Sequence, residues 1–241
     1  AFSGSGRSHP RMMSMSDQHC VGDEEPLSVE QCKAWWQKKV SEGYFTAFSF
    51  GFSHPHLIES LHLGKDSCIL EIGCGYGRET SQFIKLSDHV WAVDLSDAAL
   101  ELTRRHAPSV HTVPYDGWTL PFPNPLCDSD FDLVYGCFVI QHMSKRAALR
   151  VFAESLRVLK PGGSVLFEFF ECGHYSSTKG NCLSGGSMYN NSYTLEEAKA
   201  AIRTDGGEVK SVHTVPYGVL PSETLPTFNH WIEFGRRKPG G

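Results

Sequence analysis

The sequence predicts an α/β fold: a single Rossmann-like, doubly wound sheet of about seven strands, mostly parallel, with helices on both faces. Short apolar runs alternate with segments of helical periodicity from about residue 65 onwards, which is typical of a parallel sheet with crossover helices. The last two expected strands are joined by a proline-containing loop instead of a helix. An antiparallel C-terminal strand is therefore expected.

The expected strands are short apolar segments that end at glycine, acidic or turn residues. They cover residues 68–72, 89–93, 110–113, 131–136, 164–170, 208–215 and 230–236. Helical periodicity between them predicts helices that end near residues 86, 106, 160 and 204, and the sequence KPGG is expected to stop the third of these. The predicted helix caps are Ser28, Ser96, Ser144 and the box formed by Thr194 and Glu197.

Composition divides the chain into three parts. Residues 1–25 are predicted to be a disordered N-terminal segment or tag, although the acid-free stretch 1–16 also fits a trimmed organellar targeting segment. Residues 26–64 are expected to form an N-terminal helical lid, with helices over 28–40 and 55–63. Residues 65–238 form the main predicted domain. Its polar, glycine-rich insertion loop 173–192 is of a length that is usually functional or disordered.

Charge and cysteine content restrict the partners. The net charge of −5 disfavours a general nucleic-acid binder, so nucleic acid is an unlikely partner. The eight cysteines contain no C-x-x-C pair, which predicts free thiols, no metal site and a cytoplasmic location. No apolar run approaches the roughly 18 residues of a membrane span, so no membrane partner is predicted. Oligomeric state has no signal in the sequence.

The stretch ILEIGCGYGRET contains the first candidate site. Gly73, Gly75 and Gly77 follow the first strand of the main domain, where doubly wound folds bind ligands. A dinucleotide fingerprint would place its third glycine one residue later, and Glu71 would repel a pyrophosphate. The carboxylate suits a ligand with positive charge. S-adenosylmethionine has an ammonium and a sulfonium group and no phosphate, so Glu71 is expected to face the ammonium or to orient the loop.

Five ordered motifs resemble the class I S-adenosylmethionine-dependent methyltransferases, in particular their small-molecule, type 11-like group. They are ILEIGCGYG, VWAVDLS, YDGW, FDLVYGCFVIQHM and LRVLKPGGSVLF, and the resemblance covers residues 65–236. It implies a methyltransferase with S-adenosylmethionine as cofactor. The cofactor-binding residues that follow are Tyr44, Glu71, Gly73, Gly75, Gly77, Asp94, Leu95, Asp116, Gly117, Trp118, Gly136 and Cys137.

The resemblance assigns roles to the acids. Asp94, at the end of the second strand, would bind both ribose hydroxyls, and Asp116 would bind the adenine amino group. Each acid also has a structural interpretation, since Asp94 could cap the next helix and Asp116 could be a turn residue before Gly117. Trp118 could stack on the adenine or simply pack in its loop.

The catalytic candidate is His142 in VIQHM, directly after the fourth strand. A histidine can accept a proton near neutral pH, which a hydroxyl acceptor would require; a structural role in the turn is the alternative. The expected partner is a small-molecule acceptor methylated on O, N or S, because YGCF stands where DNA amino-methyltransferases carry [DN]PP[YF]. The alternatives are a non-catalytic nucleoside-binding partner protein and an RNA or protein methyltransferase.

Overall fold

A computed structural model of the chain describes residues 29–44, 50–122, 131–143, 145–172, 193–218 and 227–237. The elements in chain order are α1 (Val29–Ser41), α2 (Pro55–Glu59), β1 (Cys68–Ile72), α3 (Thr80–Leu86), β2 (His89–Asp94), α4 (Asp97–His106), β3 (His111–Pro114), β4 (Phe131–Gly136), the 3-10 helix η2 (Ile140–His142), α5 (Lys145–Val158), β5 (Leu159–Cys172), α6 (Leu195–Thr204), β6 (Gly207–Gly218) and β7 (Thr227–Arg236).

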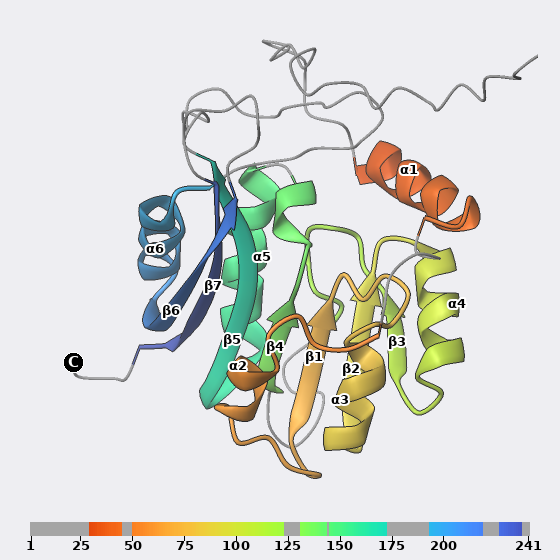
Figure 1. The fold of residues 1–241 in the computed structure, drawn as a ribbon, viewed down its shortest axis with the longest axis horizontal. Helices are drawn as coiled ribbons and strands as arrows, with labels where there is room; N and C mark the ends of the chain where they lie inside the picture. Colours follow the sequence, from red (N-terminus) through yellow and green to blue (C-terminus); the bar gives the residue numbers. More distant parts are fainter. Residues whose placement is uncertain are drawn as a thin grey trace, which may run out of the picture.

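The described residues form one seven-stranded sheet in the order β3-β2-β1-β4-β5-β7-β6 (Figure 1). Strands β1 to β5 pair in parallel, whereas β7 runs antiparallel to both β5 and β6. This confirms the predicted fold class and its antiparallel C-terminal strand. The strand order reverses between β1 and β4, so the switch point at which such folds bind ligands lies at the ends of these two strands.

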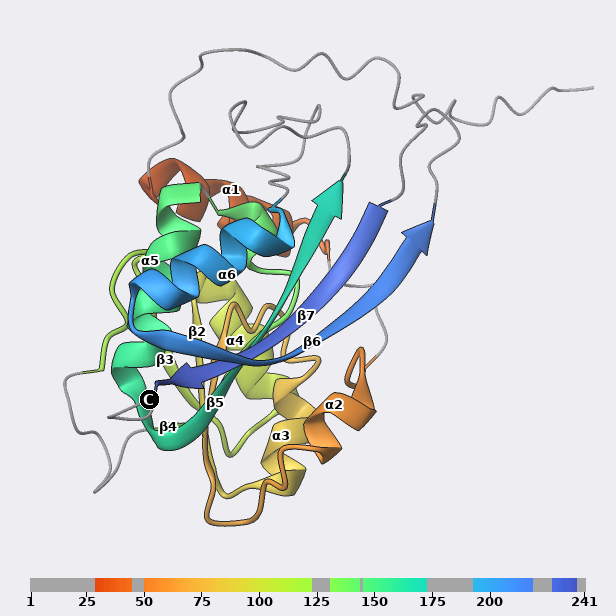
Figure 2. The same ribbon diagram turned by 90° about the vertical axis from the view of Figure 1, so that its left-hand side faces the viewer.

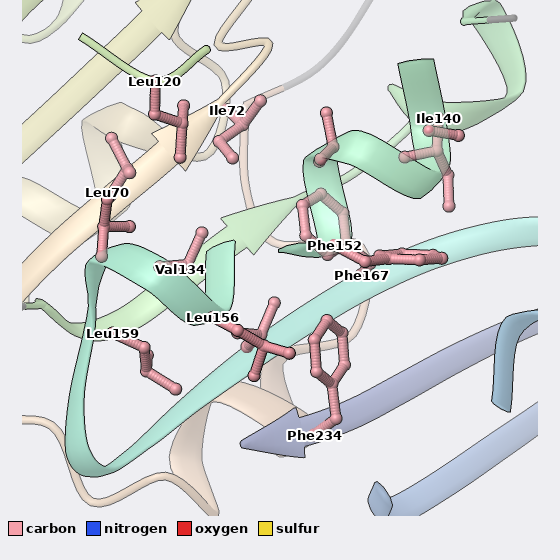
Figure 3. Packing of buried hydrophobic residues seen from close by; sticks show 14 of the residues in the cluster. Leu70, Ile72, Leu120, Val134, Ile140, Phe152, Leu156, Leu159, Phe167 and Phe234 are labelled. Carbon is pink, nitrogen blue, oxygen red and sulfur yellow. The ribbon is translucent and has the colours of Figure 1, made fainter. Parts of the chain in front are cut away.

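Helices cover both faces of the sheet (Figure 2). Helices α5 and α6 pack on one face, where Phe152, Phe167 and Phe234 belong to a continuous buried cluster (Figure 3). Helices α2, α3 and α4 pack on the other face, around Phe83 and Trp231. Burying large apolar side chains on both faces is the main stabilisation of such a fold.

Two differences from the predicted elements have local causes. Helix α5 ends at Val158, and the KPGG segment lies within the long strand β5 instead of following the helix. The register between β4 and β5 shifts there, and Gly162 takes a φ of +86°, so the glycines absorb an irregularity in the strand. The second helix stops at Glu59, short of the predicted residue 63.

The cap predictions are confirmed where the structure describes them. The Ser96 side chain accepts a hydrogen bond from the backbone of Ala99, and Thr194 and Glu197 form the reciprocal capping box. The proposed caps Ser28 and Ser144 lie outside the described residues, as do the predicted disordered segment 1–25 and the insertion loop 173–192. None of the described helices has the length and apolarity needed to cross a bilayer.

The two N-terminal helices have different surroundings. Helix α1 lies next to α4 (Figure 1), where Lys33 pairs with Asp97 at 3.1 Å and Gln37 accepts a hydrogen bond from the Ser96 hydroxyl at 3.0 Å. Helix α2 instead buries Ile58 in the core on the α3 side of the sheet. That the segment 26–64 acts as one lid stays a prediction.

Candidate active site

The glycine loop joins β1 to α3 at the switch point of the sheet. Gly73, Gly75 and Gly77 have φ values of 71°, 57° and 85°, a region that side-chain-bearing residues rarely adopt. A Cβ on Gly73 would lie 2.5 Å from Val139 Cγ2, and one on Gly77 would lie 3.1 Å from the Thr103 Cα. The glycines therefore allow both the turn itself and the close approach of the loop to η2 and α4.

Asp94 links the end of β2 to this loop. Its Oδ2 accepts a hydrogen bond from the Gly75 backbone at 3.0 Å, and its Oδ1 accepts one from the Ser96 backbone at 2.9 Å. Burial raises the pKa of the Asp94 carboxyl, while the backbone donors act in the opposite direction. Each carboxylate oxygen has a second acceptor direction, so the group can still accept two hydroxyl donors from a ligand.

Glu71 orients the loop from behind. It is buried and accepts a hydrogen bond from the Thr80 hydroxyl at the start of α3. Burial and the neighbouring Glu79 raise the pKa of Glu71 well above its ordinary value. Glu71 does not line the cavity described below, so of the two roles expected for it, the arrangement corresponds to orientation of the loop.

Glu79 and Arg78 bring charge to the cavity itself. Both line it, and they form an ion pair with each other. The Arg78 guanidinium also donates to the Ser53 hydroxyl at 2.7 Å and approaches the Cys137 sulfur at 3.4 Å. Sequence reasoning missed both residues, although they directly follow the third glycine of the loop.

These groups open onto one cavity of about 320 Å³ at the carboxyl ends of β1, β2 and β4, a size typical of small-ligand sites. Helix α1 covers part of the cavity with the side chains of Trp36 and Val40. Its lining comprises Trp36, Val40, Tyr44, Ile72, Gly73, Cys74, Gly75, Tyr76, Arg78, Glu79, Asp94, Leu95, Ser96, Ala99, Tyr115, Cys137, Phe138, Val139, His142 and Met143.

The cavity thus brings together most of the predicted residues. Tyr44 and Leu95 line the cavity. Gly77 does not line it but packs against Thr103 of α4, next to the lining residues of the glycine loop. The predicted catalytic His142, in η2, lies on the same cavity wall as Met143. Its ring meets Trp36 of α1 edge to face, with ring centroids 5.2 Å apart.

The three residues in the loop predicted to contact the adenine, Asp116, Gly117 and Trp118, do not line the cavity. Asp116 is exposed, and its Oδ1 accepts hydrogen bonds from the backbones of Trp118 and Thr119, both at 2.7 Å. This is the turn role considered for it from the sequence. Gly117 has a φ of 79°, and the Arg146 guanidinium lies over the Trp118 ring at 5.0 Å. Adenine contacts for these three residues stay a prediction.

The end of β4 forms the wall opposite Asp94. A Cβ on Gly136 would overlap the Phe167 ring, so this strand end requires glycine. Cys137 lines the cavity, and burial raises the pKa of its thiol well above the ordinary value. Phe138 follows with a φ of +56°, unusual for a residue with a β-carbon. Nothing in the sequence signals this strained turn.

A ligand with several hydroxyl groups fits the donors and acceptors present. The Tyr115 hydroxyl is buried, belongs to a lining residue and has no hydrogen-bond partner within the described part of the chain. An unpaired buried hydroxyl is costly, and this one is enclosed by the hydrophobic core cluster to which Tyr115 belongs. The cavity lining contains Asp94 and two glycines of the loop, which the sequence predicts to bind the cofactor.

Comparison with known proteins agrees with this geometry. The model of the methyltransferase domain family matches residues 69–163. A sterol 24-C-methyltransferase from Neurospora crassa is 25% identical over 194 residues, covering 74% of this chain and 49% of that protein. The tRNA N(3)-methylcytidine methyltransferase Mettl2 of Drosophila melanogaster is 28% identical, covering 71% of this chain and 58% of that protein. The chain thus spans about half the length of these relatives.

Solved structures share the fold. An S-adenosylmethionine-dependent methyltransferase from Anabaena variabilis superposes with a TM-score of 0.64 at 14% identity, covering 90% of this chain and 99% of that one. A complex of DhpI with SAH superposes with a TM-score of 0.57 at 20% identity, covering 87% and 98%. Because one relative is named for methylation of tRNA, the expectation that nucleic acid is an unlikely partner is not supported. Residues 69–163 thus match the methyltransferase domain family, and the described residues share the fold of a solved S-adenosylmethionine-dependent methyltransferase.

Proposed function

We propose that this chain transfers a methyl group from S-adenosylmethionine to an O, N or S atom of a small-molecule acceptor. One observation carries the proposal: a single cavity at the switch point joins the glycine loop and Asp94 to His142 and Met143 on the opposite wall. A cofactor held by the first pair would direct its reactive end toward the second pair. Methyl transfer requires such in-line placement more than any other contribution from the protein.

The chain's own residues divide the work of binding. Asp94, which lines the cavity, would accept the ribose hydroxyls. Glu79 supplies a carboxylate for the ammonium end, where Arg78 can balance the charge of a carboxylate. When bound, S-adenosylmethionine supplies a methyl group already activated by its sulfonium. Trp36 and Val40 of α1, with Tyr44 just after that helix, would exclude water from this site.

His142 would either orient the methyl acceptor through a hydrogen bond or remove a proton from it. It lines the cavity, and its ring is oriented by the edge of Trp36, so it stands on the wall that an acceptor would meet. A hydroxyl acceptor would need this proton transfer, whereas an amine or thiol would need positioning alone.

The acceptor class has one competing candidate. The Drosophila relative is named for methylation of tRNA and aligns with 71% of this chain, so an RNA acceptor is the second proposal. A chain that binds the nucleoside without catalysis is the third. The small-molecule acceptor is preferred because Trp36 of α1 and Tyr44, just after that helix, line a cavity of only about 320 Å³.

Cofactor binding and methyl transfer test these proposals in turn. S-adenosylmethionine or S-adenosylhomocysteine at 100 times its dissociation constant should stabilise the fold by about 2.7 kcal/mol, whereas NAD should give no shift in Tm. A Tm shift with NAD alone would overturn the cofactor assignment. Transfer of a radiolabelled methyl group to a metabolite panel and to bulk tRNA, each assayed separately, then distinguishes the acceptor classes. Tight cofactor binding without transfer to either would favour the non-catalytic alternative.

A further inference from the structure

We infer that Glu168 of β5, which lies outside the cavity lining, is a positioning residue that holds the strained turn 137–139 and through it sets the place of His142. The inference rests on the proposed function and extends it to the acceptor wall of the cavity. Glu168 does not touch the cavity, so its role would be exerted entirely through the turn.

Glu168 is completely buried beneath the end of β4. Its Oε2 accepts a hydrogen bond from the Phe138 backbone at 2.7 Å, and its Oε1 accepts one from the Asn229 side chain of β7 at 2.6 Å. The Cys137 sulfur lies 3.8 Å from Oε2. A carboxylate removed from water is stable only with such partners.

The residue that Glu168 holds is in an unfavourable backbone conformation. Phe138 has a φ of +56° although it carries a β-carbon, and its side chain is 39% exposed, so its own packing does not explain the conformation. Such residues persist when surrounding contacts over-determine them, and they concentrate at functional sites. The charge-assisted hydrogen bond from the Phe138 N–H to Glu168 is the contact that fixes the turn here.

The turn leads directly to the proposed catalytic histidine. Cys137, Phe138 and Val139 all line the cavity, and η2 starts at the next residue. The His142 backbone donates to the Val139 carbonyl at 2.9 Å. A change in the Phe138 conformation would therefore move both the cavity wall and His142.

The charge state of Glu168 decides how firmly the turn is held. Burial raises the pKa of Glu168 to about 7, while the donors Phe138 and Asn229 and the charge of Arg78 act against this rise. The other titratable groups facing it are Glu79 at the start of α3 and Cys137 at the end of β4. Ionised Glu168 accepts strongly from both donors, whereas protonated Glu168 uses one oxygen to carry the proton.

The same group opposes stability, which separates a positioning role from a structural one. Its pKa in the folded chain is above the value of about 4.3 expected in an unfolded chain. The folded state therefore binds the proton more tightly, and stability falls as pH rises from about 4 through 7. Above pH 7 the fold keeps a buried carboxylate at a cost to stability, which a purely structural role would not explain.

The decisive variant is Glu168→Gln, which keeps the shape and removes the charge. Its amide oxygen can accept from Phe138, and its amide nitrogen can donate to the Asn229 Oδ1, which has no partner among the described residues. We expect the Tm at pH 8 to rise by roughly 5 °C and the fall of Tm with pH to flatten. We expect the cofactor affinity of the variant to stay within about 2-fold of the wild-type value and its turnover to be about 10-fold lower. The exposed Glu208→Gln is the matched control and should change none of these.

A spectroscopic readout needs neither cofactor nor acceptor. The backbone amides of Phe138 and Val139 should titrate with a midpoint near pH 7 in the wild type and lose that transition in Glu168→Gln. Retention of the transition in the variant, or a Tm that falls at pH 8, would overturn the inference. If the transition is lost but S-adenosylmethionine fails to shift the Tm of the wild type, the proposed function fails and the coupling of Glu168 to the turn stands.

Discussion

The two walls of the cavity are built around one acid each, and the acids are held in opposite ways. Asp94 receives backbone hydrogen bonds from Gly75 and Ser96, within 19 residues of itself, and lines the cavity. Glu168 receives its hydrogen bonds from Phe138 and from Asn229, 30 and 61 residues away, and stands behind the cavity wall. The first wall is a local motif, whereas the second is assembled by the sheet.

This difference indicates how the two walls could evolve separately. A motif of a few consecutive residues that binds an invariant cofactor keeps its own geometry when the rest of the sheet changes. The opposite wall depends on hydrogen bonds involving β5 and β7, neither of which contributes a described residue to the cavity lining. We call the wall with the glycine loop and Asp94 the cofactor wall, and the wall with residues 137–139 and His142 the acceptor wall. The variants below change these walls and the contact between them, in order of decreasing expected effect.

The largest effect is expected on the acceptor wall. His142→Ala should reduce turnover by about 10²–10⁴-fold if the histidine accepts a proton, and should change cofactor affinity by less than about 1 kcal/mol. His142→Gln keeps a hydrogen-bonding group without the proton acceptor, so equal losses in both variants identify proton transfer. The exposed His89→Ala at the start of β2 is the control. A parallel loss of Tm and activity in both His142 variants would make the residue structural.

On the cofactor wall, Asp94→Ala should weaken S-adenosylmethionine binding by about 2–4 kcal/mol, measured by titration calorimetry. The variant removes the expected ribose contacts and also leaves the Gly75 and Ser96 amides without their acceptor. The control is Asp97→Ala, three residues further along, which loses only an exposed ion pair with Lys33. It should change the free energy of S-adenosylmethionine binding by less than about 0.5 kcal/mol. Unchanged cofactor affinity in Asp94→Ala would mean that Asp94 only holds the Gly75 and Ser96 backbones and does not bind the cofactor.

The contact between the two walls can be tested at Gly73, where the glycine loop approaches Val139 of the acceptor wall. Gly73→Ala combines a φ of +71° with a Cβ 2.5 Å from Val139 Cγ2, so a loss of about 2–3 kcal/mol in unfolding free energy is expected. Gly206→Ala has a φ of +80° but nothing within 4 Å, and it should lose only about 1 kcal/mol. Chemical denaturation measures both. Equal losses would show that the two walls do not press on each other.

The smallest effect is expected at Asp116. Its side chain closes a turn outside the cavity lining, so Asp116→Asn, which can keep that turn, should change cofactor affinity by less than about 1 kcal/mol. The adenine contact implied by the family resemblance requires a larger loss. Calorimetry on this variant therefore decides between the turn and the adenine roles, and a loss above 2 kcal/mol would restore the adenine role.

Much of the fold and of the cofactor wall could be predicted from the sequence, because these features depend on neighbouring residues. The alternation of strands and helices, the capping box at Thr194 and the glycine loop all have signals within a few positions. Other features had no local signal. The sequence did not indicate that Glu79 lines the cavity while Glu71, eight residues earlier, is buried against Thr80, because this depends on how the loop turns.

The sequence by itself determined the fold class and placed the glycine loop and the acid Asp94 at the ends of β1 and β2, since periodicity, glycine placement and strand ends are properties of short segments. The tertiary structure alone decided that Asp116 closes a turn, that Phe138 is strained and that Glu168 lies behind it. The physical reason is pairing across the sheet. Burial and hydrogen bonding of Glu168 arise only when β4, β5 and β7 are brought side by side, and no short segment contains that information.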